Sequence, residues 1–375
     1  MKKIWRFLLI YGVFRTLIKI AGRTRYVALK IFFRNFYVKK YKEISLIGCG
    51  QFGFTTMSYY LQKRWRKGGF LDCFDVDRRA AKTTAAFWGY NMIENVSDLI
   101  NNPQCKIIYI ASNHYTHTPY AIQALKAGKT VYVEKPIAVT IEQFNNLLKT
   151  INNPSFSHIP IYVGYNRPFS KAIRQVTKYL LNINKPITLN CFISGHKIAP
   201  DHWYRDAKEG TRICGNVGHW IDLSIHLFNK RGAIPYNYEI SIVTNNDDEP
   251  DDNLSIVYKT EFNDLVTIVL TSRDEPFEGI NETINLQCDN IISKIDDFRR
   301  QQIWIGDKMF RYKYFPKDCG HKRAILQPFM SNNRECKEWI YSTYLMLKIK
   351  EMVLNHETHS SYNMLDHLDK TFIGC

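Results

Sequence analysis

The sequence lacks the features that would assign it to several common classes of protein. Its nine cysteines include no Cys-x-x-Cys pair, so it contains no recognisable zinc or dithiol redox motif. They are odd in number and stand in apolar stretches such as LIGCG and NCFIS, which suits unpaired thiols in a reducing compartment. Internal repeats and low-complexity tracts are also absent. With 375 residues, of which 45% are hydrophobic, the chain is long enough for a large core, and we predict a two-domain cytoplasmic protein.

Acidic residues are missing from residues 1–42, which hold twelve lysines and arginines. The formal net charge of the whole chain is +16 at pH 7, so the remainder carries only +4. A nucleic-acid-binding domain would carry a basic stripe on its folded part, and we therefore expect no nucleic-acid partner. Residues 1–42 also lack a run of about 18 uncharged apolar residues, so they do not predict a membrane-spanning helix.

Residues 1–42 do contain a basic amphipathic pattern. Apolar residues recur at helical spacing, with basic residues between them, namely Arg6, Arg15, Lys19, Arg23, Lys30 and Arg34. One interpretation is a helix that lies on an anionic membrane surface, which would make the protein peripheral on the inner face of the membrane through residues 1–40. The alternative, equally open, is a helix that docks on its own protein or on a partner subunit.

Two further regions differ in their strand pattern. Residues 43–160 alternate continuously apolar strands with helices, which is typical of a parallel sheet covered on both faces. Residues 161–375 contain long alternating strands interrupted by turn segments such as DDEPDDN, together with the probable helices GNVGHWIDLSIHLF and RECKEWIYSTYLMLKIKEMVL. This second pattern predicts an α/β domain with a largely antiparallel sheet.

The motif Gly48-Cys49-Gly50-Gln51-Phe52-Gly53 lies between the predicted strand EISLIG and a predicted helix. Gly48 permits a tight turn, Gly50 lets the backbone approach a pyrophosphate, and Gly53 allows close packing of helix on strand. The helix N-terminus then stabilises the phosphates. In this context the motif predicts a dinucleotide-binding turn, with Gln51 and Phe52 among its contacts.

Asp75 ends the second predicted strand, 22 residues after Gly53. A carboxylate at this position hydrogen-bonds the ribose hydroxyls and favours NAD over NADP. Arg78 and Arg79 follow closely and could accept a 2′-phosphate, so NADP stays open as the cofactor.

Two later strands end in polar groups at the same predicted sheet edge. Ser112, Asn113 and His117 follow the strand CKIIYIAS, and Glu134-Lys135-Pro136 follows the strand TVYV. Ligands of open α/β sheets bind outside the carboxyl ends of the strands, so we expect these groups near the cofactor. The alternative for Asn113 and His117 is turn formation and helix capping.

Four motifs in order resemble the glucose–fructose oxidoreductase / inositol dehydrogenase (Gfo/Idh/MocA) family, namely GCGQFG, ASNHYTHTPYAIQALKAGKTVYVEKP, GYNRPFS and GNVGHWIDL. The resemblance covers roughly residues 43–230, continues more weakly to the C-terminus and leaves out the first 40 residues. It implies a Rossmann doubly wound parallel sheet over residues 43–160. It also implies a substrate-binding α/β domain over residues 161–375, whose large open, mostly antiparallel sheet commonly serves oligomerisation into dimers or tetramers.

The resemblance further implies hydride transfer between NAD(P) and a secondary hydroxyl of a sugar, cyclitol or nucleotide sugar. Lys135 would assist the accompanying proton movement, a role that needs an amine of lowered pKa. His219 would be its partner. The motif also allows a cis peptide bond between Lys135 and Pro136.

One family feature is missing. Many relatives have an aspartate four residues before the histidine, and a branch acting in surface-polysaccharide sugar pathways has a glutamate three residues before it. This chain has Gly215 and Asn216 at those positions. Asn216 can hold a substrate hydroxyl but cannot exchange a proton at pH 7.

The loop DHWYRDAKEGTR, residues 201–212, and the motif GYNRPFS supply the expected substrate contacts. Aromatic and cationic side chains suit a sugar ring and a phosphate or carboxylate. The candidates are Trp203, Tyr204, Arg205, Tyr165 and Arg167, with Asn216 as above, Lys208 and Arg212 in the same loop, Asn166 beside Arg167, and His321 as a weaker candidate. The alternative is that the loop is an ordinary solvated basic connection.

A metal site is not expected. His219, Asp222 and His226 share a predicted helix face, but positions seven residues apart lie about 10 Å apart, too far for one ion. Asp222 and His226 are better explained as hydrogen-bonding residues of the helix.

The sequence thus favours an NAD(P)-dependent oxidoreductase without a metal site, which acts on a sugar or nucleotide sugar in surface-glycan synthesis. Two alternatives stay open. One is a non-catalytic sensor or scaffold that kept the dinucleotide fold. The other is a redox-neutral enzyme that reduces and reoxidises a tightly bound NAD within one cycle.

Overall fold

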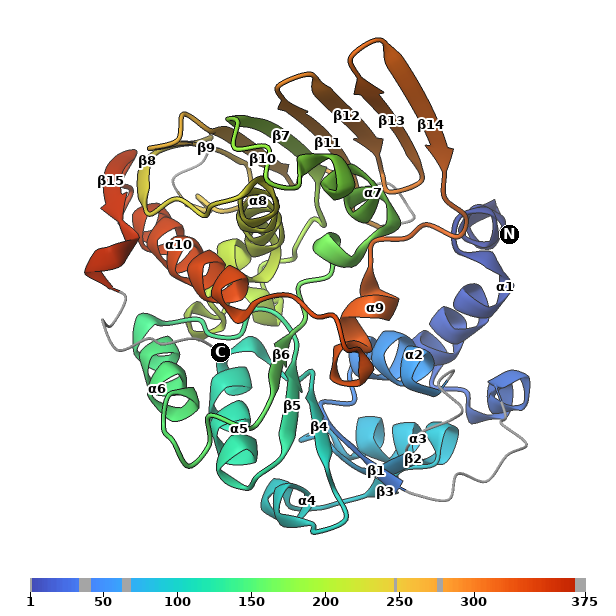
Figure 1. The fold of residues 1–375 in the computed structure, drawn as a ribbon. Helices are drawn as coiled ribbons and strands as arrows, with labels where there is room; N and C mark the ends of the chain where they lie inside the picture. Colours follow the sequence, from blue (N-terminus) through green and yellow to red (C-terminus); the bar gives the residue numbers. More distant parts are fainter. Residues whose placement is uncertain (1, 34–41, 63–68, 246–247, 275–278, 368–375) are drawn as a thin grey trace. The chain divides into compact units, whose positions relative to one another are not determined.

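The computed structural model describes residues 2–33, 42–62, 69–245, 248–274 and 279–367 (Figure 1). The chain forms two compact units, which are described one at a time. The parallel-sheet unit comprises residues 7–164 and 321–333, and the mixed-sheet unit comprises residues 1–6, 165–320 and 334–375.

The parallel-sheet unit contains the six-stranded sheet that the sequence predicts. Its strand order is β3-β2-β1-β4-β5-β6, and every pair is parallel. Strands such as β4 are buried at every position, because helices cover a parallel sheet on both faces. The strands are β1 (Lys42–Ile47), β2 (Gly69–Phe74), β3 (Asn91–Met92), β4 (Ile107–Ile110), β5 (Thr130–Val133) and β6 (Ile161–Val163).

The helices of this unit begin and end at residues suited to those places. Asp77 caps α3 by accepting hydrogen bonds from two backbone N–H groups, and Gly89 ends α3 in the left-handed conformation. Thr140 caps α6 in the same way. The helices are η2 (Gly53–Met57, a π-helical turn), α2 (Ser58–Gln62), α3 (Arg78–Trp88), α4 (Val96–Asn101), α5 (His114–Lys126), α6 (Ile141–Ile151), α9 (His321–Ile325) and η7 (Gln327–Phe329).

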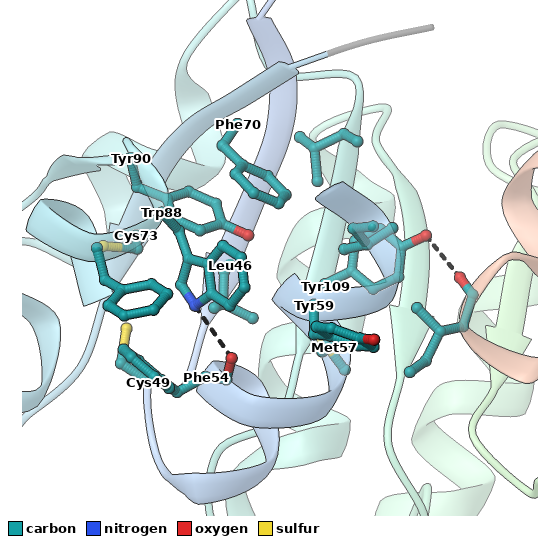
Figure 2. Close-up of a cluster of buried hydrophobic side chains, with 14 of the residues drawn as sticks. Leu46, Cys49, Phe54, Met57, Tyr59, Phe70, Cys73, Trp88, Tyr90 and Tyr109 are labelled. Atoms are coloured by element: carbon teal, nitrogen blue, oxygen red, sulfur yellow. Dashed lines mark hydrogen bonds between the residues drawn. The ribbon is translucent and has the colours of Figure 1, made fainter. Parts of the chain in front are cut away.

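A buried cluster of apolar side chains joins the glycine-rich turn to its neighbours (Figure 2). The ring of Phe54 lies edge to face against Trp88, whose indole Nε1 donates to the Phe54 carbonyl at 3.0 Å. The Tyr109 hydroxyl donates to the carbonyl of Ile325 at 2.8 Å. Residues 321–333 therefore complete a core that begins much earlier in the chain, a return that the predicted boundary at residue 160 did not include.

The N-terminal extension is part of this cluster. It forms α1 (Lys2–Thr24), interrupted at Gly12 (φ 78°), and η1 (Val27–Phe33). Ile18 and Ala21 are fully buried, and the Arg15 guanidinium donates to the Thr55 carbonyl at 2.6 Å. Of the two interpretations of this segment, docking on its own protein is thus observed. No helix within the described part of the chain is long and apolar enough to cross a membrane.

The mixed-sheet unit holds a nine-stranded sheet of order β14-β13-β12-β11-β7-β10-β9-β8-β15. All neighbours are antiparallel except β10 and β7. The strands are β7 (Ile187–Ser194), β8 (Asn237–Thr244), β9 (Leu254–Thr260), β10 (Leu265–Thr271), β11 (Asn281–Cys288), β12 (Ile291–Asp296), β13 (Arg300–Ile305), β14 (Lys308–Lys313) and β15 (His359–Asn363). The prediction of a mostly antiparallel second sheet is confirmed.

Helices pack on the inner face of this sheet. Residues of β7 are alternately buried and more exposed, as expected for a sheet with one covered face. Helix α7 (Lys171–Leu180) contacts β12, α8 (Gly218–Arg231) contacts β7, and α10 (Cys336–Leu354) contacts α8 and β8. The other face keeps large apolar side chains such as Phe192 and Val243 exposed.

Candidate active site

Four strand ends of the parallel-sheet unit carry the residues predicted to bind the cofactor. Strands β2, β1, β4 and β5 are consecutive neighbours and parallel, so their carboxyl ends lie at one edge of the sheet. The glycine-rich turn follows β1, Asp75 follows β2, Ser112 follows β4 and Glu134 follows β5. The structure therefore places the predicted groups of this unit along a single edge.

Gly48 and Gly53 have the steric roles that their spacing predicts. Gly48 has φ 95°, and a Cβ there would lie 2.4 Å from the carbonyl carbon of Ala111. A Cβ on Gly53 would lie 2.2 Å from the Gly48 carbonyl oxygen, so the helix packs directly on the turn. Gly50 differs, since a Cβ there would meet no described atom within 4 Å. The open side at Gly50 fits the approach of a pyrophosphate.

Asp75 is joined to this turn. One of its carboxylate oxygens accepts from the Cys49 backbone N–H at 2.6 Å, and the other accepts from the Asp77 N–H at 2.8 Å. Each oxygen retains a lone pair with which a ribose hydroxyl could bond. Arg78 and Arg79 are the two cations considered for a 2′-phosphate. Of these, Arg78 forms an exposed ion pair with Glu94 at 2.6 Å.

Two side chains of the turn have packing roles. The Gln51 amide donates to the Gly22 carbonyl at 2.8 Å, and the Phe52 ring lies 5.8 Å from the His321 ring, measured between centroids. Cofactor binding by Gln51 and Phe52 stays a prediction, and these contacts show only how the two side chains pack. His321, the weaker substrate candidate, is part of the same packing.

His117 connects two of the strand ends. Its Nδ1 lies 2.8 Å from the Pro136 carbonyl oxygen and its Nε2 lies 3.0 Å from the Ser112 carbonyl oxygen. The net pKa of His117 is lowered to about 4. Burial is the largest cause, Lys135 acts in the same direction, and the hydrogen bonds to the two carbonyls oppose it. The neutral ring at pH 7 has one N–H, so it donates to one of these carbonyls at a time. Asn113 is the N-cap residue of α5.

The end of β5 passes from buried apolar residues to a buried carboxylate. Glu134 is 6% exposed and accepts from the Tyr132 hydroxyl at 3.1 Å. Gly164 leaves room for it, because a Cβ there would lie 2.6 Å from the Glu134 Oε1. Lys135 follows, partly exposed, and its peptide bond to Pro136 is cis. A lysine of intermediate exposure thus directly follows a buried carboxylate at the strand tip.

The mixed-sheet unit holds the second set of predicted residues around α8. His219 is 7% exposed, and its ring lies 6.0 Å from the ring of Tyr165, edge to face. Tyr165 is buried and donates to the Met346 sulfur at 3.5 Å. The π-helical turn η6 (Ile213–Val217), which includes Asn216, directly precedes α8. Tyr165 therefore fixes the ring of His219 from the side.

Tyr204 occupies the space in which a side chain at position 215 would lie. A Cβ on Gly215 would be 2.3 Å from the Tyr204 Cε1 and 2.6 Å from its hydroxyl oxygen. The same hydroxyl donates to the Gly215 carbonyl at 3.3 Å. Trp203, 41% exposed, packs on the Tyr204 ring at 4.5 Å between centroids. The absence of the family's aspartate therefore coincides with an aromatic ring in its place.

Arg167 has a structural environment. Its guanidinium makes two hydrogen bonds to Glu282, at 3.0 and 3.2 Å, and stacks 4.8 Å from the Trp220 ring centroid. The side chains of Arg167 and Glu282 are 6% and 2% exposed. A guanidinium held in this way stabilises the core, and we withdraw Arg167 from the expected substrate contacts. Neighbouring Asn166 donates to the Cys319 carbonyl.

Arg205 is likewise committed to an ion pair. It donates to Asp252 at 2.7 Å and lies 3.0 Å from Glu249, while Arg212 donates to Asp252 at 2.9 Å. The DDEPDDN segment, predicted only as a turn, thus holds the 201–212 loop in place. We withdraw Arg205 as a substrate ligand for this reason, and Lys208 pairs with Asp206 at the surface.

Asp222 and His226 are hydrogen-bonding residues of α8, as predicted. Asp222 accepts two hydrogen bonds from Arg334, and His226 Nδ1 lies 2.8 Å from Glu338. Burial raises the pKa of Glu338, but His226 and Arg334 outweigh it and hold that pKa below its usual range. Within the described ranges, no group of three His, Cys, Asp or Glu residues is arranged to hold a metal ion.

Known proteins share both the motifs and the fold. Residues 42–155 match the model of the oxidoreductase family with an NAD-binding Rossmann fold, Gfo/Idh/MocA. Inositol 2-dehydrogenase of Azotobacter vinelandii is 30% identical over 105 residues, which are 28% of this chain and 30% of that protein. Glucose-6-phosphate 3-dehydrogenase of Bacillus subtilis is 23% identical over 207 residues, covering 54% of this chain and 55% of that protein. The matches thus span about a third to a half of these relatives.

Solved structures extend the likeness of fold to most of the chain. Levoglucosan dehydrogenase in complex with NADH superposes with a TM-score of 0.69 at 15% identity, covering 86% of this chain and 99% of that one. GenD2 from gentamicin A biosynthesis, in complex with NAD, gives a TM-score of 0.70 at 13% identity, with coverage of 88% and 99%.

Residues 42–155 match the Gfo/Idh/MocA family model, and the resemblance inferred from the motifs is confirmed. The expected NAD-binding domain is confirmed with it. The choice between NAD and NADP, and the roles of individual residues, remain predictions.

We predict that His117→Gln makes the stability of the protein less dependent on pH. Burial holds the pKa of His117 near 4, whereas an unfolded histidine titrates near 6.5, so the unfolded chain binds more protons in between. The wild type should lose about 2 kcal/mol of unfolding free energy between pH 7 and pH 5 through this group, and the variant should not. Urea unfolding at both pH values measures the difference.

The exposed His158 provides the control for this prediction. His158→Gln should keep the wild-type pH dependence. An unchanged slope in His117→Gln would show that His117 is not held neutral by burial.

We also predict that Gly215→Ala destabilises the protein by about 1–3 kcal/mol, because the added methyl group meets the Tyr204 ring. Adding Tyr204→Ala should restore part of that loss. Gly50→Ala is the matched control, since its methyl group meets open space. The urea midpoint of each variant and of the wild type is measured without cofactor. Equal midpoints for Gly215→Ala and Gly50→Ala would contradict the predicted overlap with the Tyr204 ring.

Proposed function

We propose that this member of the Gfo/Idh/MocA oxidoreductases transfers hydride between a nicotinamide dinucleotide and a secondary hydroxyl of a carbohydrate. One arrangement carries this proposal, namely the glycine-rich turn, Asp75 and the Lys135 tip at one edge of the parallel sheet. NAD is favoured over NADP, because Asp75 is held by backbone N–H groups at the ribose end of that edge. A bound cofactor would supply or accept the hydride.

The chain's own residues would orient the cofactor and move the proton. Gly50 leaves room for the pyrophosphate, and His117 holds the loops after β4 and β5 together. Lys135 would exchange the proton of the substrate hydroxyl, because it is the amine at the strand tip beside the buried Glu134. The resemblance implies that His219 takes part in the same reaction.

The mixed-sheet unit would bind the substrate through aromatic and polar side chains of the 201–212 loop and of the turn before α8. Trp203 offers an exposed aromatic face to a sugar ring, and Tyr204 and Asn216 offer a hydroxyl and an amide for its hydroxyls. Tyr165 packs edge to face on the ring of His219. Similarity to an inositol dehydrogenase and a glucose-6-phosphate dehydrogenase supports a carbohydrate substrate. Within that class we propose a nucleotide sugar of surface-glycan synthesis, because the basic N-terminus suits a membrane-associated pathway.

The outer face of the nine-stranded sheet is the proposed contact of a homo-oligomer. Its exposed apolar side chains include Phe192, Val243 and Leu265. Exposed apolar positions on one face of a sheet are typical of surfaces that associate.

A non-catalytic dinucleotide-binding protein is the second candidate function. The Tyr204 ring at position 215 favours it, because the usual carboxylate partner is replaced by a group that titrates near pH 10 in water. Turnover of any carbohydrate by the wild-type protein would rule out this second candidate.

We predict that Lys135→Met lowers kcat by about 10²–10⁴-fold while the Kd for NADH changes little, because the proton transfer is lost and the turn is untouched. A panel of sugars, inositols and nucleotide sugars with NAD⁺ supplies the activity assay, and NADH fluorescence supplies the Kd. Lys126→Met, at an exposed position on α5, is the matched control and should keep full activity. Full activity in Lys135→Met would refute the proposed mechanism.

We further predict that the protein binds vesicles containing anionic lipid through the exposed apolar side chains of α1. Leu9, Val13 and Phe14 are each more than half exposed, on a segment without acidic residues. Leu9→Glu combined with Val13→Glu should abolish sedimentation with phosphatidylserine vesicles, and neutral phosphatidylcholine vesicles are the control. A wild type that stays in the supernatant with both vesicle types would exclude a membrane role.

A further inference from the structure

The N-terminal extension packs on the helix that follows the glycine-rich turn. Ile18 and Ala21 of α1 are fully buried. Gly22 makes the closest approach, because a Cβ there would lie 2.2 Å from the Thr55 Cγ2. A side chain at Gly22 would require the Thr55 side chain to move.

Two hydrogen bonds hold the extension in this register. The Arg15 guanidinium donates to the Thr55 carbonyl at 2.6 Å, inside the π-helical turn η2. The Gln51 side chain, from within the glycine-rich motif, donates to the Gly22 carbonyl at 2.8 Å. The extension is therefore bonded to the motif and to the first turn of the helix after it.

Arg25, just past the end of α1, reaches the turn itself. Its Nη2 donates to the Cys49 carbonyl at 3.0 Å, and its guanidinium carbon lies 5.0 Å from the Phe54 ring centroid. Arg25 has φ 55°, a conformation that residues other than glycine adopt rarely. The strained backbone is evidence that the surrounding contacts hold this side chain in place.

The same turn residue is bonded from its other side by Asp75. The Cys49 backbone thus donates its N–H to Asp75 at 2.6 Å and accepts at its carbonyl from Arg25. Partial burial lowers the pKa of Arg25, while Asp75 and Asp77 raise it and Arg79 lowers it. Arg25 therefore acts at the end of β2, where the ribose is expected.

We propose that Arg25 is a positioning residue of the dinucleotide site, which fixes the peptide of Cys49 so that the turn is formed before the cofactor binds. This inference rests on the proposed function of the sheet edge. A preformed turn strengthens binding because the ordering cost is already met in the free protein. The extension, which lies outside the family resemblance, thereby becomes part of the cofactor site.

The test is a titration of NADH and NADPH into four full-length proteins: wild type, Arg25→Ala, Arg25→Lys and Arg23→Ala. Arg23 is the matched control, an exposed arginine two residues away. Arg25→Ala should raise both Kd values about tenfold, as expected for the loss of a hydrogen bond from a charged donor. Arg25→Lys should recover part of the affinity, and Arg23→Ala should match the wild type.

Each outcome separates this inference from the proposed function. A wild type that binds neither dinucleotide would refute the proposed function. Wild-type affinity in Arg25→Ala would refute the inference alone. A loss confined to NADPH would also overturn it, because Arg25 would then act by contact with the 2′-phosphate.

Thermal unfolding without cofactor checks that the variants are folded. If Arg25→Ala does not fold, the folded Arg25→Lys variant tests the inference in its place. The inference then requires that the Kd of Arg25→Lys lie above the wild-type value. An affinity in Arg25→Lys equal to that of the wild type would then overturn the inference.

Discussion

Backbone packed directly on backbone is the constraint on which the parallel-sheet unit depends. Gly48 lies so close to the end of β4, and Gly53 so close to Gly48, that neither position has room for a side chain. This close packing starts the helix at the strand end and leaves the side of Gly50 open. It also brings the Cys49 N–H to the carboxylate of Asp75. The contact of Asp75 with the turn therefore follows from a steric requirement of two glycines, Gly48 and Gly53.

The sheet edge could be predicted from the sequence because its determinants are local. Alternating apolar strands and helices fix a parallel sheet, and in such a sheet every strand ends at the same edge. The positions of Asp75, Ser112 and Lys135 at strand ends follow from that rule alone. Family resemblance added the cis peptide at Pro136, which no local pattern specifies.

The substrate side was harder to predict, because the partners of its charged residues are distant in sequence. Arg167 is neutralised by Glu282, 115 positions later, and Arg205 by Asp252. A sequence shows that an arginine is present but not whether it forms an ion pair with a carboxylate distant in the chain. The same limit hid Arg25, whose helix was interpreted from its own amphipathicity and whose contact with Cys49 depends on tertiary packing.

The return of residues 321–333 to the parallel-sheet unit has a consequence for biosynthesis. Ile325 accepts a hydrogen bond from Tyr109 and fills a core that Ile18 also enters (Figure 2). On the ribosome, the first strand of this unit emerges long before α9 is made. The unit must therefore wait, with part of its apolar surface uncovered, until nearly the whole chain has been translated. Such a delay favours chaperone engagement over independent co-translational folding of the first domain.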